Sequence, residues 1–263
     1  MTPALDPRPA SLRPQAEVWL GWASFLLLIV LWAALALALD SRFLPPPWTV
    51  LARIGWLTNE GHLLPDFAAT LGRAILGFVI AMVLGTGLGI ALGRSRLVDR
   101  LFLNWVVVGM NLPAIVIAIL CFIWLGLSDT ALILAVVLNK TPIVITNIRQ
   151  GVLSFDPAYD EFARAYRLSR GQTFRLIHAP QLVPYLLTAA RTGLSLVWKI
   201  VLVFEVLGSD SGVGFRVSLF FQFFDLKGIL AYTMVFVAIV MALEHLAIGP
   251  LERRLLKWRT DQI

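Results

Sequence analysis

Apolar runs of about 17 to 25 residues, separated by shorter polar segments, make up most of this chain. A helix needs about 20 apolar residues to cross the hydrocarbon core of a bilayer, so each run is a candidate span. The first run is longer than the ~7–15 residues of a signal-peptide core, so we expect it to stay uncleaved. The pattern predicts an all-α polytopic membrane protein with about six transmembrane helices. The runs cover residues 18–39, 69–93, 101–125, 131–147, 186–207 and 229–248.

Composition excludes an ordinary soluble domain. The 263 residues are 59% hydrophobic and 14% charged, with a mean hydropathy of +0.81, whereas soluble domains carry about 25% charged residues. The net charge of +6 and the pI near 10.0 would also suit a nucleic-acid partner. Its distribution favours the positive-inside pattern of membrane proteins instead, and we expect no nucleic-acid partner. The single cysteine, Cys121, excludes an intrachain disulfide.

Basic residues divide unequally between the two sides that six spans would define. Both chain ends and the segment between the fourth and fifth spans share one side, which carries fourteen lysines and arginines against four on the other. The positive-inside rule therefore places that side in the cytoplasm. We expect a cytoplasmic tail at residues 1–16, a transmembrane domain at 17–250 and a basic cytoplasmic tail at 251–263.

One long polar segment, residues 156–184, interrupts the apolar pattern. Asp156 can cap a short helix with Pro157 in its first turn. Ser169 to Gln172 has the Ser-x-x-Gln form of a capping box, which starts a second helix. A cytoplasmic helical hairpin between two spans is a docking surface for an aqueous partner.

The run 69–93 carries small residues every fourth position, which predicts a helix–helix seam. Small side chains on one helix face let a second backbone approach closely in lipid. The seam residues are Gly77, Ala81, Gly85, Gly89 and Gly93.

Charged residues inside spans are costly, so they indicate a partner or a wet path. Lys140 lies in the fourth span, and Arg191, Lys199 and Glu205 lie in the fifth. Arg191 and Lys199 share a helix face. They either line a path for an anionic solute, or Arg191 reaches the cytoplasmic interface while Lys199 pairs with a carboxylate on another helix. Arg73, near the outer end of its span, is interpreted as an interface anchor.

Proline and glycine mark three further places in the chain. Asn111-Leu112-Pro113 breaks the third span, which is tolerated only against protein or water. The three prolines at 45–47 predict an extended, helix-free path inside the extramembrane connection 40–66. Residues 208–214 (GSDSGVG) form a turn, which is either a plain loop or the start of a short path-lining helix.

The polar hairpin resembles the EAA loop of permease subunits from ATP-binding-cassette (ABC) importers. Glu161-Phe162-Ala163, with Ile177 and Pro180 at matching offsets, carries this resemblance. In that family the loop, here residues 153–182, supplies the coupling helices that dock on the ATPase. The resemblance implies that docking involves Glu161, Phe162, Ala163, Arg164, Arg167, Ser169, Gly171 and Pro180. The family's usual Gly falls on Arg167, so we expect the bend at residues 169–171.

The wider pattern is similar to permeases of the nitrate/sulfonate/taurine group. Gly77-Phe78, Trp124 with Gly126, Asn147 with Gly151, and the tail Glu252-Arg253-Arg254 all match. The group's usual Arg-Pro pair falls on Met110-Asn111. The path residues that the resemblance and the polar pattern suggest are Met110, Asn111, Lys140, Lys199, Glu205, Gly212 and Gly214.

The resemblance implies a multi-pass permease of the bacterial inner membrane with both termini cytoplasmic. Its partners would be a second permease copy, two ABC ATPase subunits that bind ATP-Mg, and an extracytoplasmic solute-binding protein. The sequence has no Gly-x-x-x-x-Gly-Lys-[Ser/Thr] phosphate loop, so we expect no ATPase activity and no cofactor in this chain. His62, His178 and His245 lack metal-like spacing, so no metal site is expected. The alternative is a six-span secondary transporter or membrane enzyme that works alone.

Overall fold

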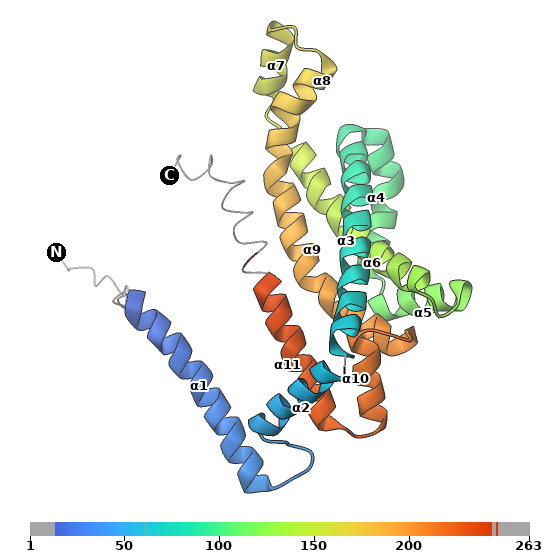
Figure 1. The fold of residues 1–263 in the computed structure, drawn as a ribbon. Coiled ribbons are helices and arrows are strands. Elements are labelled where there is room, and N and C mark those ends of the chain that lie inside the picture. Colours follow the sequence, from blue (N-terminus) through green and yellow to red (C-terminus); the bar gives the residue numbers. More distant parts are fainter. Residues whose placement is uncertain (1–13, 61, 244–245, 247–263) are drawn as a thin grey trace, which may run out of the picture.

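The computed structural model describes residues 14–60, 62–243 and 246, and the regular structure in this part of the chain is helical (Figure 1). Most of the predicted tail 1–16, the end of the sixth run and the basic tail 251–263 lie outside the described residues. The prediction of an all-helical fold is confirmed. The helices in chain order are α1 (Pro14–Leu39), α2 (Pro47–Asn59), α3 (Leu63–Arg94), α4 (Arg96–Asn111), α5 (Ala114–Leu125), α6 (Asp129–Leu153), α7 (Pro157–Ala165), α8 (Arg170–Thr173), the π-helical turn η1 (Phe174–His178), α9 (Ala179–Gly208), α10 (Val213–Gln222) and α11 (Leu226–Leu243).

Four helices in the described residues are long and apolar enough to cross a membrane: α3, α6, α11 and the continuous helix Arg170–Gly208. The pair α4 and α5 would be a fifth span if it is counted as one, but it bends by 98°. The bend falls at Leu112–Pro113, where the sequence predicted an interruption, because proline removes a backbone donor. A shorter apolar helix covers Ala23–Leu39 within α1. The count of six spans stays a prediction.

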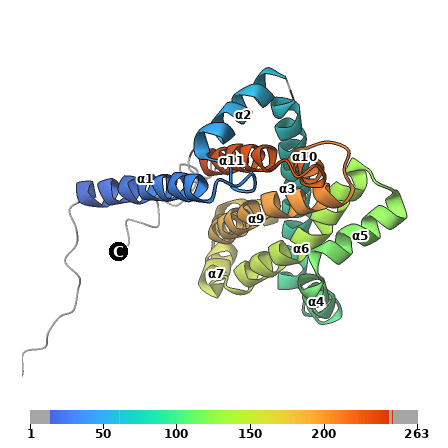
Figure 2. The ribbon, with the colours of Figure 1, turned by 90° about the horizontal axis from the view of Figure 1, so that it is seen from below.

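The bundle is built on α3, α6 and α9, while α1 projects away from the other helices (Figure 2). The helices α7 and α8 lie at one end of the bundle, and α2 and α10 lie at the opposite end (Figure 1). The connection 40–66 differs from its expected form. Its triple proline is extended only up to Pro46, and Pro47 then occupies the first turn of α2, where a missing N–H costs nothing.

Small residues on α3 pack directly against branched side chains on α6. A Cβ added to Gly85 would lie 2.5 Å from the Cβ of Val144, and one added to Gly93 would lie 2.5 Å from the Cβ of Val152. Gly77 and Gly89 meet Val136 and Ile148 in the same register. The two helices therefore run parallel at a separation that only small residues allow.

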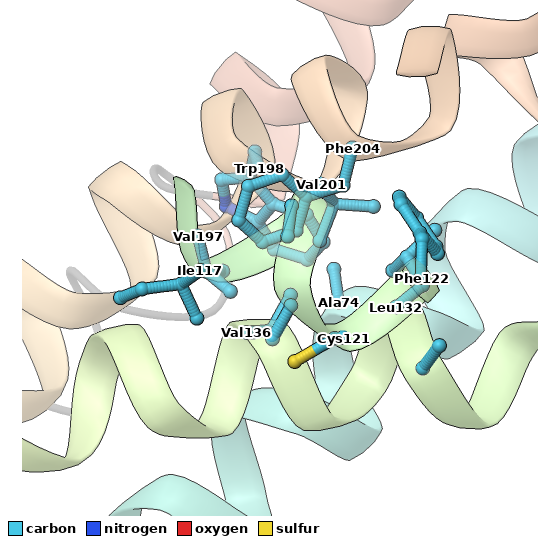
Figure 3. Packing of buried hydrophobic residues seen from close by; sticks show 13 residues of the cluster. Ala74, Ile117, Cys121, Phe122, Leu132, Val136, Val197, Trp198, Val201 and Phe204 are labelled. Atoms are coloured by element: carbon cyan, nitrogen blue, oxygen red, sulfur yellow. The ribbon is translucent and has the colours of Figure 1, made fainter. Parts of the chain in front are cut away.

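The largest apolar cluster joins α3, α5, α6 and α9. Trp198 and Phe204 of α9 pack among Leu132 and Val136 of α6 and Phe122 of α5 (Figure 3). Both aromatic rings are buried. This packing holds the C-terminal half of α9 against α6, so α9 has one buried face and one exposed face.

Candidate functional site

The polar hairpin folds as its capping residues predicted. The Ala158 N–H donates to Asp156 Oδ1 at 2.9 Å, and Pro157 begins α7. Ser169 accepts from the Gln172 N–H, while the Ser169 N–H donates to Gln172 Oε1, so the capping box is confirmed. Two backbone amides at the start of α8 are thus satisfied without any contact to the rest of the bundle.

The bend between the two hairpin helices lies at residues 166–169 and overlaps the expected residues 169–171 only at Ser169. Arg167 adopts a positive φ of 53°, and the Leu168 N–H donates to the Ala163 carbonyl at 2.9 Å. The Arg167 N–H also donates to the Arg164 carbonyl, which completes a Schellman helix end. Arg167 therefore occupies the position that glycine normally takes, in spite of its side chain. Gly171 instead lies inside α8.

His178 ties the hairpin to the bundle, a role that its sequence context did not reveal. Its Nε2 donates to Asp160 Oδ1 at 2.9 Å, and its Nδ1 accepts from Arg94 Nη2 at 2.6 Å. The ring also stacks on Phe155, with 5.0 Å between centroids. One imidazole thus links α7, the end of α3 and the continuous helix. No local motif in the sequence places Asp160 and Arg94 beside His178.

Aromatic and basic side chains cover the exposed surface of the hairpin. Tyr159, Phe162 and Tyr166 are 53%, 51% and 68% exposed. Arg164, Arg167, Arg170 and Arg175 are exposed as well, as is Glu161, while Ala163 is buried. A hollow of about 370 Å³ lies between the two hairpin helices, lined by Asp160, Ala163, Arg164, Arg167, Leu168 and Thr173. The Phe162 and Tyr166 rings lie in contact, with 4.3 Å between centroids, and exposed aromatic clusters of this kind indicate an interaction surface.

A single long helix connects this surface to the opposite end of the molecule. The continuous helix Arg170–Gly208 has 39 residues, which corresponds to about 58 Å. It starts at the capping box and ends beside the predicted Gly-rich turn. Although it contains the π-helical turn η1 and Pro184, this helix is one continuous connection between the two ends.

The far end of that helix carries a buried polar cluster centred on Glu205. Its carboxylate accepts from Arg73 Nη1 at 2.8 Å, from the Thr70 hydroxyl at 2.9 Å, and from the Gly214 N–H at 2.9 Å. The Glu205 side chain is fully buried. Arg73 also binds Asp129 of α6 and both the carbonyl and the hydroxyl of Ser211. The interpretation of Arg73 as an interface anchor is wrong, because the tertiary fold buries it between two carboxylates.

A second buried carboxylate, Asp66, completes the cluster. It accepts from Arg216 Nε and from the Tyr232 hydroxyl, both at 2.7 Å. The Gly212 N–H also donates to Asp66. Gly212 has a φ of 99°, and a Cβ there would collide with the Glu205 carboxylate, so this position requires glycine. The turn is therefore no plain loop: it is fastened at both ends and leads into the short helix α10.

The predicted path residues do not form one site. Glu205, Gly212 and Gly214 meet in the polar cluster. Met110 and Asn111 are exposed at the end of α4, and Lys199 is exposed on α9. Lys140 is buried, and the register of the α3–α6 seam places it opposite Ala81. The structure gives the Lys140 ammonium no hydrogen bond within the residues that it describes.

Comparison with known proteins decides the family. The sequence model of one protein family, the binding-protein-dependent transport system inner membrane component, matches residues 83–249 of this chain. The chain belongs to this family. It is a permease of the ABC importer type, which agrees with the resemblance that the sequence suggested.

Two curated relatives match along most of the permease chain. The taurine transport system permease protein TauC of Escherichia coli is 30% identical over 241 residues, with 89% of this chain and 87% of TauC covered. The riboflavin transport system permease protein RibX of Chloroflexus aurantiacus is 29% identical, with 98% and 97% covered. A solved inward-facing structure of the MetNI methionine ABC transporter shares the fold at a TM-score of 0.62 and 17% identity, with 71% of this chain and 93% of that chain covered.

Proposed function

We propose that this permease forms the translocation path of an ATP-driven importer and is coupled to a separate ATPase through its hairpin, residues 156–180. The exposed aromatic and basic surface of α7 and α8 carries this proposal, because it stands at the end of a 39-residue helix. An ATPase bound at the hairpin would move α9 as a unit. The family resemblance adds a second permease copy, two ATPase subunits and a solute-binding protein on the outer side.

The proposed coupling between the ATPase and the path depends on how tightly α3, α6 and α9 pack. The α3–α6 seam is too tight to slide, because each glycine meets a branched side chain at contact distance. The continuous helix touches this pair along one face and carries the hairpin at its end. ATP-driven closure of the ATPases would therefore tilt α9 against the α3–α6 pair and change access to the path. The Glu205 cluster would hold the outer ends of these helices together during that motion.

The proposed solute is a small organic anion of the sulfonate type. TauC carries taurine, a sulfonate, while RibX carries the larger riboflavin. The exposed cations of α9, Arg191 and Lys199, favour the anionic class. Uptake of taurine and of riboflavin by the same reconstituted complex separates these two solute classes.

The test of coupling compares two exposed phenylalanines at opposite ends of the bundle. Phe162 is 51% exposed on the hairpin, and Phe223 is 74% exposed after α10. Phe162→Ala is expected to reduce both retention of the ATPase during purification and ATP-driven uptake into proteoliposomes. Phe223→Ala is the matched control and is expected to retain the ATPase. Uptake that proceeds without ATP or an ATPase subunit would support the stand-alone transporter instead.

A further inference from the structure

The exposed face of α9 differs chemically from the exposed faces of the other long spans. On α3 the large exposed side chains are aliphatic: Ile75, Leu76, Val79, Val83, Leu84 and Leu88. On α11 they are Met234, Val237 and Met241, and on α6 they are Leu134, Leu138 and Leu153. Such faces suit contact with lipid chains.

The exposed surface of α9 carries hydroxyls and cations in addition to the aliphatic side chains Leu196, Val203, Val206 and Leu207. Thr188, Thr192 and Lys199 are exposed and lie at spacings of four and seven residues, so they form one stripe. Arg191 is exposed beside them, and Leu196 lies between Thr192 and Lys199 on the same face. The opposite face of the helix packs Val197, Trp198 and Val201 into the core.

The ammonium group of Lys199 lies too deep in the span to reach the membrane interface. It precedes Gly208, the end of α9, by nine residues, which is about 13 Å along the helix. That distance exceeds the reach of a lysine side chain, so it cannot snorkel to the outer interface. A lysine that faced lipid at this depth would be strongly unfavourable.

The described spans also leave Lys199 without a carboxylate partner. Each of their acidic residues already binds an arginine: Asp66 binds Arg216, Asp99 binds Arg149, and Asp129 and Glu205 both bind Arg73. The charge of Lys199 is therefore not neutralised by a carboxylate of the described spans. A hydrated surface with excess positive charge attracts anions.

We infer that the stripe formed by Thr188, Thr192 and Lys199 lines a water-filled path in which Lys199 binds the oxyanion group of a small solute such as a sulfonate. Lys199 supplies both the charge and the hydrogen-bond donors. The Thr188 hydroxyl donates to the Pro184 carbonyl at 2.9 Å, and Thr188 lies about 16 Å from Lys199 along the helix, so the threonines add polar surface to the path at other depths. This inference rests on the proposed transport function and names its solute class and its binding residues.

The experiment measures thiol reactivity at Leu196, on the stripe and three residues from Lys199. Leu196→Cys is made in a Cys121→Ser background of the full chain and labelled in membrane vesicles of both orientations. The two reagents are the anionic 2-sulfonatoethyl methanethiosulfonate and the cationic 2-(trimethylammonio)ethyl methanethiosulfonate. A wet path predicts reaction with both reagents, with a preference for the anionic one.

The added variant Lys199→Gln is expected to lower the anionic-to-cationic rate ratio roughly tenfold, since one charge about 6 Å from the thiol changes each rate about threefold in water. Lys227→Gln, which removes an exposed cation at the start of α11, is expected to leave the ratio unchanged. Val83→Cys, on the aliphatic face of α3, is expected to stay unreactive.

Two outcomes overturn the inference. If Leu196→Cys is as inert as Val83→Cys, the stripe faces lipid or a dry contact with a second copy. If it reacts but Lys199→Gln leaves the ratio unchanged, the path is wet and Lys199 does not select anions. Because labelling needs no ATP, either failure is distinct from a failure of ATPase coupling.

Discussion

Arg73 binds two carboxylates whose surroundings differ, and this difference predicts unequal effects of removing either charge. Glu205 is fully buried, whereas the Asp129 side chain is 63% exposed. The perturbations are Glu205→Gln and Asp129→Asn, which remove one negative charge each while keeping side-chain size. Both variants leave Arg73 with one remaining carboxylate.

The magnitudes follow from burial. Breaking a buried ion pair costs about 3–5 kcal/mol because the remaining charge stays buried. Glu205 also accepts from Thr70 and from the Gly214 N–H, and the amide of Gln cannot satisfy all of these donors. An exposed pair such as that of Asp129 is worth about 0–1 kcal/mol. At about 2–4 °C per kcal/mol, Glu205→Gln should lower Tm by at least ~6 °C and Asp129→Asn by at most ~4 °C.

Cys121 provides the assay. It is the single cysteine of the chain and is 1% exposed in the core, so a thiol-reactive fluorophore reports its exposure on heating. Both variants and the parent are compared in one detergent. The double variant Arg73→Met with Glu205→Leu should lower Tm by less than the sum of the shifts for Arg73→Met alone and Glu205→Leu alone. The reason is that the double variant leaves no unpaired charge in the core. Equal Tm shifts for Glu205→Gln and Asp129→Asn, or strictly additive losses, would refute this reasoning.

Three further predictions concern the hairpin and the seam. Arg167→Gly should stabilise the hairpin by about 1 kcal/mol, because it removes the cost of a side chain in the left-handed region; hydrogen exchange of the hairpin measures this, and Arg170→Gly should loosen it. Gly85→Leu should abolish stable expression, since even its Cβ would lie 2.5 Å from Val144, whereas Gly87→Leu on the same helix meets open space and should be tolerated. His178→Ala should free the hairpin from Arg94 and Asp160 and raise its protease sensitivity, with core Tm changed little.

Local signals in the sequence identified most of the helical framework. The apolar runs, the caps at Asp156 and Ser169 and the break before Pro113 depend on neighbouring residues, so they can be read from the chain. The register of small residues on α3 is likewise a periodic pattern of one helix. These features need no knowledge of which helices meet.

Contacts between residues far apart in the sequence could not be predicted, because no local pattern shows which helices meet. Arg73 and Glu205 are separated by 132 positions, and His178 and Arg94 by 84. A charged residue near a helix end resembles an interface anchor until its partner is known. The bend at Arg167 was also misplaced, because an arginine rarely takes a positive φ and the sequence favoured Gly171. Helix α2 was not predicted, because three consecutive prolines indicate an extended chain. The last of them, Pro47, is instead the first residue of the helix.

Photo-crosslinking from the hairpin tests the central claim most directly. A benzophenone side chain replaces Tyr166, which is 68% exposed, or Phe223, which is 74% exposed at the other end. After illumination of native membranes, adducts are identified by mass spectrometry. The account predicts that position 166 crosslinks to an ABC ATPase and that position 223 does not. An ATPase adduct from position 223 alone, or only lipid adducts from position 166, would contradict it.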